Sequence, residues 1–205
     1  MAIVLGPDWQ RELWASPYSL RFELNQGSSI VNAFTSAYDR ARCLARAALP
    51  SQRIMAIIAA IPNPSIELGA ERKGWVGRTA FEILAGMGVP TDTSEANWLG
   101  HVYPNDKDDP EAVLWEHRAV RLTWDQADIL LWSGIAFDIG VTPQAPVISK
   151  LVDIERGVTV YAYDDRGMDI TALNADRVSG LYTQFERWLL DYDRPRMASA
   201  LNTGA

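Results

Sequence analysis

The sequence predicts a single-domain α/β (α+β) sandwich, in which a mixed, largely antiparallel sheet packs with about four helices. Three observations predict this class. Helical and strand patterns alternate in the first half of the 205 residues, short strands follow one another closely later, and no Ser/Gly run or repeat divides the chain. Closely spaced strands favour an antiparallel meander. We expect an N-terminal arm at 1–16, one α/β domain at 17–195 and a flexible tail at 196–205.

The first elements are a strand, a helix and a second strand. Residues 20–24 alternate apolar and charged side chains, which is the period of a half-buried strand. Apolar side chains then recur on one stripe from 30 to 49, and Pro50 ends this helix. Cys43 lies among apolar residues of the helix, so we expect it to be buried. The continuous apolar run at 54–61 predicts a central strand covered on both faces.

The middle of the chain predicts one helix and two strands. The helix is expected at about 73–87, and the strands at 98–103 and 112–122. Glycines weaken the helix, each by up to ~1 kcal/mol relative to alanine.

A capping box begins the most apolar helix, at 124–139. The Thr123 hydroxyl can accept from the Gln126 backbone N–H, and the Gln126 side chain can reach back. A helix that is apolar almost all round is expected to be central in the fold. Gly140 is its expected end.

Three strands and a last helix complete the pattern. The strands are expected at 147–154, 158–163 and 168–172, joined by tight turns. The last helix is expected to begin after Asn174, its cap, and to end near Tyr192. Its apolar stripe includes Val178, Leu181, Phe185 and Trp188.

Charge and composition exclude several classes of protein. The formal net charge is −7 and the pI is about 4.8, whereas a nucleic-acid binder needs a basic surface. One cysteine excludes an internal disulfide and suits a reducing compartment. The N-terminus lacks the pattern of a secretory signal, and no run approaches the ~20 apolar residues of a membrane span. We expect a cytoplasmic protein that binds neither nucleic acid nor membrane.

Carboxylate and guanidinium groups are dense in two stretches, residues 163–169 and residues 191–194, and each stretch lies at the end of an apolar segment. We call them the first and the second acidic stretch. They supply the candidate ligand- or partner-binding residues, which are Asp164, Asp165, Arg166, Asp169, Asp191, Asp193 and Arg194. Together with residues 20–24 and 37–41, these two stretches resemble the bacterial "domain of unknown function 3885" family. The resemblance extends over about 17–197 and implies a bacterial protein. It carries over no catalytic residue.

The first stretch has a structural and a functional interpretation. An Asp at the start of a turn can bond backbone N–H groups two residues on, and Gly167 can supply a positive φ, so a hairpin turn with a surface ion pair is expected. In the functional alternative, Asp165 and Asp169 converge on a metal or a ligand amine, and Arg166 binds an anion.

The second stretch needs an electrostatic partner, because carboxylates at the end of a helix oppose its dipole. An ion pair of Arg166 or Arg194 across the two stretches would join them into one structural lock. On this hypothesis, Arg166→Ala lowers the unfolding midpoint far more than an ordinary surface substitution, and an unchanged midpoint contradicts it.

The sequence contains few of the motifs that catalytic sites require. His101 and His117 lie 16 residues apart and have no metal-site spacing, and the sequence has neither a G-x-S-x-G elbow nor a phosphate loop. We therefore expect no metal and no cofactor, and the balance of this inventory is against an enzyme.

The first functional hypothesis is a non-enzymatic protein-binding module. Four of the eight tryptophans have no periodic position and can anchor an interface, namely Trp9, Trp14, Trp75 and Trp98. Acidic charge favours a basic partner surface, and an immunity protein or antitoxin-like inhibitor is one specific version. One alternative is a carboxylate- or metal-dependent hydrolase that uses the 164–169 turn with His101 or His117. Another is a small-ligand sensor, which a pocket lined by Trp and Arg would support.

Overall fold

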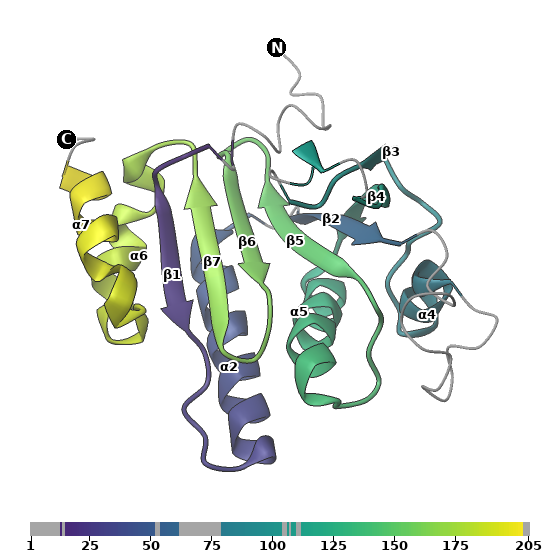
Figure 1. The fold of residues 1–205 in the computed structure, drawn as a ribbon, viewed down its shortest axis with the longest axis horizontal. Helices are drawn as coiled ribbons and strands as arrows, with labels where there is room; N and C mark the ends of the chain where they lie inside the picture. Colours follow the sequence, from purple (N-terminus) through teal and green to yellow (C-terminus); the bar gives the residue numbers. More distant parts are fainter. Residues whose placement is uncertain are drawn as a thin grey trace.

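The computed structural model describes residue 13 and residues 15–51, 54–61, 79–103, 106, 108–109 and 112–202. Its strands are β1 (Ser19–Glu23), β2 (Ile54–Ala60), β3 (Ala96–Gly100), β4 (Trp115–Leu122), β5 (Ile148–Asp153), β6 (Val158–Ala162) and β7 (Gly167–Ala172). They form one seven-stranded sheet in the order β1-β7-β6-β5-β2-β4-β3 (Figure 1). Each neighbouring pair of these described strands is antiparallel, so the largely antiparallel α+β fold is confirmed.

The helices and 3-10 turns of the described residues are α2 (Ile30–Ala48), α4 (Ala80–Gly86), α5 (Trp124–Ile139), η2 (Ala175–Arg177), α6 (Ser179–Gln184), η3 (Glu186–Trp188), η4 (Asp191–Asp193) and α7 (Arg194–Asn202). Helices α2 and α5 cover one face of the sheet, and α6 and α7 lie beside β1 (Figure 1). Within the described ranges, no helix combines the length and apolar character that a membrane span requires.

The main core lies between the sheet and α2 with α5. Alternate residues of the strands enter it, including Leu20, Phe22 and Leu24, which are almost fully buried. The seven residues of β2 are all buried, as expected for a central strand covered on both faces. A smaller cluster on the opposite face, called the outer face below, contains Met55 and Ile57.

Local signals placed α2 and α5 accurately. The Ser29 side chain caps α2 by accepting from the Asn32 N–H. Thr123 and Gln126 form the expected reciprocal capping box. Gly140 ends α5 with a φ of 70°, the left-handed conformation that glycine adopts without strain.

The expected helix from Asn174 to Tyr192 is wrong. The chain forms short helical pieces there, and Asn174 makes no side-chain cap bond. The break occurs where Leu189 pairs with Phe22 and the Leu190 N–H donates to the Arg21 carbonyl at 2.9 Å. Because β1 is an edge strand, an extended segment at 189–190 satisfies its backbone groups, which a helix could not do.

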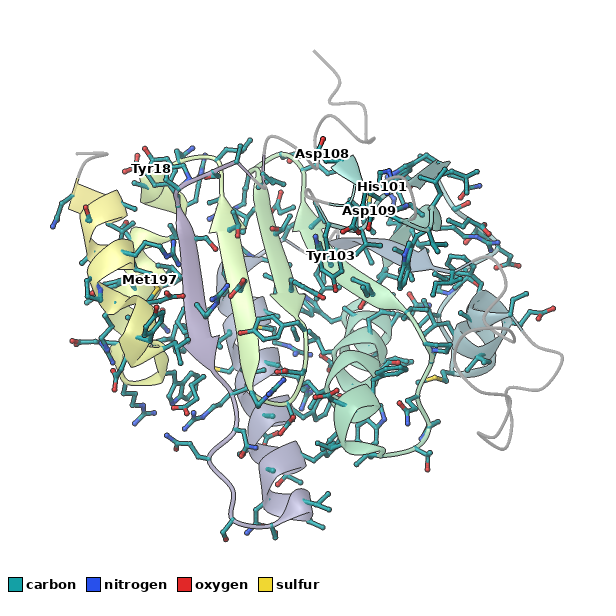
Figure 2. The ribbon with its side chains drawn as sticks, in the orientation of Figure 1. Tyr18, His101, Tyr103, Asp108, Asp109 and Met197 are labelled. Atoms are coloured by element: carbon teal, nitrogen blue, oxygen red, sulfur yellow. The ribbon has the colours of Figure 1, made fainter. Side chains whose placement is uncertain are left out.

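One further expectation differs from the structure, and another stays a prediction. The tail at 196–205, expected to be flexible, continues α7 as far as Asn202, and Met197 of this helix is buried beside β1 (Figure 2); its flexibility stays a prediction. The Arg21 N–H points at the Met197 sulfur at 3.2 Å, which anchors the helix. Cys43 is exposed, because it lies on the solvent side of α2, one turn after Arg40.

Some expectations fall where the structure gives no description. The part of the expected helix at 73–78 lies outside the described residues, as do Trp9, Trp14 and Trp75. Most of the N-terminal arm expected at 1–16 lies there too.

Candidate functional site

Arg21 joins the two acidic stretches. Its Nε and Nη2 atoms donate to the two carboxylate oxygens of Asp169 at 2.9 and 3.1 Å. Its Nη1 atom lies 3.1 Å from Asp193, which Arg196 also approaches at 3.7 Å. The hydrogen bond with Asp169 raises the pKa of the Arg21 guanidinium above its ordinary value. A lock between the stretches therefore exists, but its arginine comes from β1.

Arg166 does not reach the second stretch. Its Nε donates to Asp164 at 2.9 Å within the same turn, and Nη2 lies 3.7 Å from Asp138 at the end of α5. The Arg166 side chain is 74% exposed. The hypothesis that Arg166 crosses between the stretches is therefore wrong.

Asp164 shapes the turn, as expected. Its Oδ1 atom accepts from the backbone N–H groups of Arg166 and Gly167 at 2.8 and 2.9 Å. Gly167 is not among the glycines with a positive φ, so that part of the expectation is wrong. Its missing side chain leaves room for Tyr163 instead, because a Cβ at this position would collide with the Tyr163 ring and hydroxyl.

Asp165 holds the loop that follows β1. It accepts from the Asn25 side-chain amide at 2.8 Å, and the side-chain Oδ1 of Asn25 accepts from the Gly27 N–H at 2.7 Å. The Leu24 N–H also donates to the Arg166 carbonyl at 2.9 Å. The turn around Asp165 thus fixes the backbone on both sides of Gln26.

Arg194 acts within its own stretch as well. It donates to Asp191 at 2.6 Å and to the Glu186 carbonyl oxygen at 2.7 Å. That carbonyl belongs to η3, so the Asp191–Arg194 pair fixes the position of the turn that carries Arg187 and Trp188.

A groove of about 370 Å³ lies between these two braces, lined by Gln26, Arg40, Arg187 and Trp188. We call it the arginine–tryptophan groove. The guanidinium carbons of Arg40 and Arg187 lie 5.1 and 5.4 Å from the centre of the Trp188 ring, within the range of cation–π attraction. Arg40 also donates to the Glu23 carbonyl oxygen at 2.9 Å.

The two guanidinium groups of the groove lie close enough for their charges to interact. Burial lowers the pKa of Arg40 below its ordinary value, and the charge of Arg187 lowers it further, against the opposing effect of Glu23. Neither group forms an ion pair with a carboxylate of the described residues. The groove therefore differs from the two acidic stretches: it contains two guanidinium groups and no carboxylate among its lining residues, and Glu23 acts on Arg40 without an ion pair.

His117, a candidate partner of the 164–169 turn in a hydrolase, lies far from Asp169. His117 lies on β4, and three strands separate β4 from the β7 strand of Asp169. At ~4.8 Å between neighbouring strands, the two strands are about 19 Å apart. The parts of the chain that are described contain no group of three or more His, Cys, Asp or Glu side chains that could hold a metal ion.

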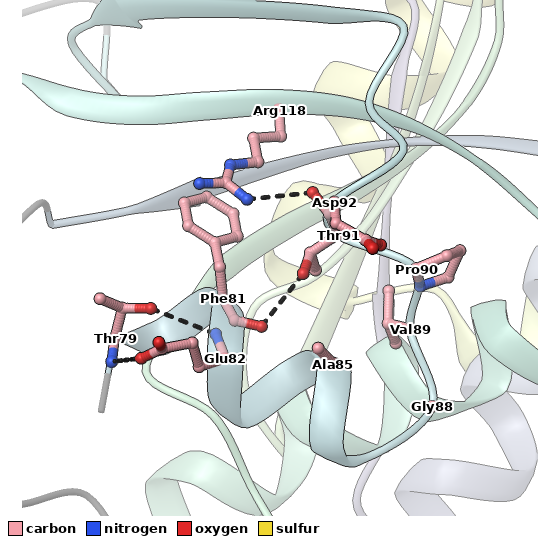
Figure 3. A pocket seen from close by; sticks show the side chains of 10 residues that line it. All are labelled: Thr79, Phe81, Glu82, Ala85, Gly88, Val89, Pro90, Thr91, Asp92 and Arg118. Atoms are coloured by element: carbon pink, nitrogen blue, oxygen red, sulfur yellow. Dashed lines mark hydrogen bonds between the residues drawn. The ribbon is translucent and has the colours of Figure 1, made fainter. Parts of the chain in front are cut away.

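A larger pocket, of about 570 Å³, lies between α4 and the loop that leads to β3 (Figure 3). Its one cation is Arg118, which donates to Glu116 at 2.8 Å and to the Thr91 carbonyl at 3.0 Å. The same guanidinium lies 3.9 Å from the centre of the Phe81 ring. Arg118 is therefore already paired and has little to offer a ligand.

The outer face carries a second group of perturbed side chains. Lys150 of β5 lies on this face, with its Nζ 5.2 Å from the centre of the Tyr161 ring, and burial lowers its pKa to about 8. Burial, with added effects of Tyr103, raises the pKa of Tyr161. Figure 2 shows Tyr103 over this part of the sheet. Lys150 and His117 share only a narrow cavity, so this group is better explained by packing.

Sequence reasoning missed Arg21, Arg187 and the role of Trp188. Arg21 and Arg40 both stand in stretches of the family resemblance, and Trp188 adjoins the second acidic stretch. The sequence signal that could have identified these residues was their position within or beside the stretches that carry the family resemblance. The spatial convergence of the groove was not visible, because it depends on the break in the expected last helix.

Comparison with protein families gives a match over most of the chain. The family model described as "Domain of unknown function (DUF3885)" matches residues 9–193. No curated protein and no solved structure shows significant similarity to the chain. The match spans the sheet, the first acidic stretch, the second acidic stretch as far as Asp193, and the four residues of the arginine–tryptophan groove.

Proposed function

We propose that this chain, which belongs to the DUF3885 family, is a non-enzymatic binding module whose ligand site is the arginine–tryptophan groove. One observation carries the proposal: both acidic stretches brace this groove. The turn around Asp165 holds Asn25 and so the loop of Gln26, and Arg194 holds the Glu186 carbonyl and so the turn of Trp188.

The groove offers the chemistry of an anion site. Guanidinium groups bind carboxylates and phosphates through two parallel N–H···O bonds, which are among the stronger hydrogen bonds in proteins. Arg40 and Arg187 lack ion-pair partners among the described residues, so an anion would not have to displace an existing carboxylate. This geometry meets the condition set above for a small-ligand sensor, a pocket lined by Trp and Arg.

The proposal is tested by calorimetric titration of the protein with sodium sulfate. We expect saturable binding, and Arg187→Gln should weaken it at least about tenfold, because a hydrogen bond to a charged group is worth roughly 1.5–3 kcal/mol. Arg177→Gln is the matched control, since Arg177 is also exposed and lies ten residues earlier on a 3-10 turn. Absence of saturable binding, or an equal loss in both variants, would overturn the proposal.

A protein partner is a second candidate function, supported by the side of β3 that pairs with no other strand among the described residues. This edge strand has no charged residue, and Leu99 is 62% exposed. Further exposed apolar side chains follow in the connection to β4, namely Tyr103, Val113 and Leu114. Uncharged edge strands can accept an extended segment of another protein as an added strand.

The net charge of −7 favours a basic segment in that role, and an immunity protein or antitoxin-like inhibitor would be one case. Fluorescence anisotropy with a labelled peptide of alternating lysine and valine tests this candidate. Leu99→Lys should abolish binding, whereas Leu173→Lys, at an exposed apolar residue elsewhere, should not. Equal binding by all three proteins would exclude an added strand at β3. The hydrolase alternative gains no support, since Asp169 is paired with Arg21 and Asp165 with Asn25.

A further inference from the structure

We infer that the ligand of the arginine–tryptophan groove is a small phosphate monoester that binds as its dianion. The inference rests on the proposed function and makes it specific. Its basis is the charge, the origin in separate elements and the space that the four groove residues provide together.

Charge balance favours a ligand with two negative charges. Arg40 and Arg187 both lie within cation–π range of the Trp188 ring, and the charge of Arg187 acts on Arg40, so an anion in the groove would reduce the repulsion between them. A monoanion would leave one of the two guanidinium charges uncompensated. A phosphate monoester carries about −1.5 to −2 charges at pH 7, which matches the pair.

The origin of the two side chains favours a tetrahedral anion. Arg40 belongs to α2 and Arg187 to η3, so two planar forks that line the groove come from different elements. A carboxylate has two oxygens in one plane, which suit a single fork. The three terminal oxygens of a phosphate monoester point in different directions, so each fork can bond its own pair with one oxygen shared.

The space in the groove favours a metabolite-sized ligand. A volume of about 370 Å³ lies at the lower end of the range for small-molecule sites. Gln26 stands on the exposed loop at the rim, and its carboxamide offers two donor hydrogens and one acceptor for the organic part of the ligand. A phosphate polymer is disfavoured, because a protein with net charge −7 repels a chain of phosphates.

The pH dependence of binding tests the dianion directly. O-phosphoserine is the probe, since its phosphate has a second pKa of ~6, and its affinity should rise about tenfold between pH 5 and pH 7. Sulfate keeps its two charges over this range, so its affinity should stay constant. Sulfate also reports any titration of Glu23, the carboxylate whose charge acts on Arg40.

Further probes separate the sources of the anion. Aspartate, which has the same backbone and a carboxylate, should bind at least about tenfold more weakly than phosphoserine, since it suits only one fork. Inorganic phosphate should also bind more weakly, because it lacks an organic part. Arg187→Gln should remove the preference for phosphoserine, and Arg177→Gln should preserve it.

The outcomes distinguish the inference from the proposed function. If aspartate binds as tightly as phosphoserine, or if the affinity for phosphoserine does not change with pH, the inference of a dianionic monoester is wrong. The proposed anion site is not contradicted by either result. If inorganic phosphate binds as tightly as phosphoserine, the ligand is free phosphate and the monoester is wrong. If the folded wild-type protein binds no anion, both the inference and the proposed function fail.

Discussion

Replacing Arg21 by glutamine should destabilise the protein by about 1–2 kcal/mol. The substitution removes one positive charge that two carboxylates share, while the amide can still donate one hydrogen bond. Arg21 is 40% exposed, so solvent screens the ion pairs, and we discount them toward the surface value of about 0.2–1 kcal/mol each. The side chains of Asp169 and Asp193 are only 23% and 12% exposed, so the two ion pairs together should contribute more to the free energy of unfolding than two ordinary surface pairs.

Thermal unfolding at pH 7 followed by circular dichroism measures this effect. For a chain of this length, each kcal/mol lowers the midpoint by roughly 2–4 °C, so Arg21→Gln should lower it by about 2–8 °C. Arg166→Gln is the control, because its exposed side chain pairs within its own turn, and its shift should be smaller. A wild-type midpoint for Arg21→Gln, or a larger shift for Arg166→Gln, would refute the assignment of the lock to Arg21.

Three further predictions concern other elements. Burial lowers the Lys150 pKa to about 8 from the 10.5 that is usual for lysine, so between these values the unfolded chain binds a proton that the folded chain does not. The wild type should therefore gain stability relative to Lys150→Met as the pH rises from 8 to 9.5, measured by thermal unfolding. A constant midpoint difference between pH 7 and pH 9.5 would contradict this. Thr123→Ala removes the α5 capping box and should lower the free energy of unfolding by about 0.5–2 kcal/mol in urea titrations, with an unchanged dependence on urea concentration. A smaller loss would mean that another group caps the N-terminus of α5. A Cβ at Gly27 would collide with the backbone of Asn32 and Ala33, so Gly27→Ala should displace the Gln26 loop. This variant should bind phosphoserine more weakly in calorimetry. Binding at the wild-type affinity would show that the loop is not part of the site.

The fold was largely predictable because its elements carry local signals. The capping box of Thr123 and Gln126 and the stop at Gly140 involve neighbours in the chain, so α5 was assigned with its observed bounds. The meander of β5, β6 and β7 depends on short turns, which are also local. These features need no knowledge of distant contacts.

The candidate site was predicted only in part, because it depends on contacts between distant segments. Arg21 meets Asp169 across 148 residues, and no local pattern gives that register. A continuous helix from Asn174 would have kept Trp188 on a core stripe. The pairing of Leu189 with Phe22 breaks that helix, and the break brings Trp188 to Arg40.

The position of β1 has a consequence for synthesis on the ribosome. Among the described strands its sheet partner is β7, and Leu189 lies on its other side, so both neighbours are translated after almost all the rest of the domain. At 5–20 residues per second, the 148 residues from Arg21 to Asp169 take about 7–30 s. During that delay Leu20 and Phe22 have no sheet to join, and the nascent chain presents an apolar segment of the kind that chaperones bind.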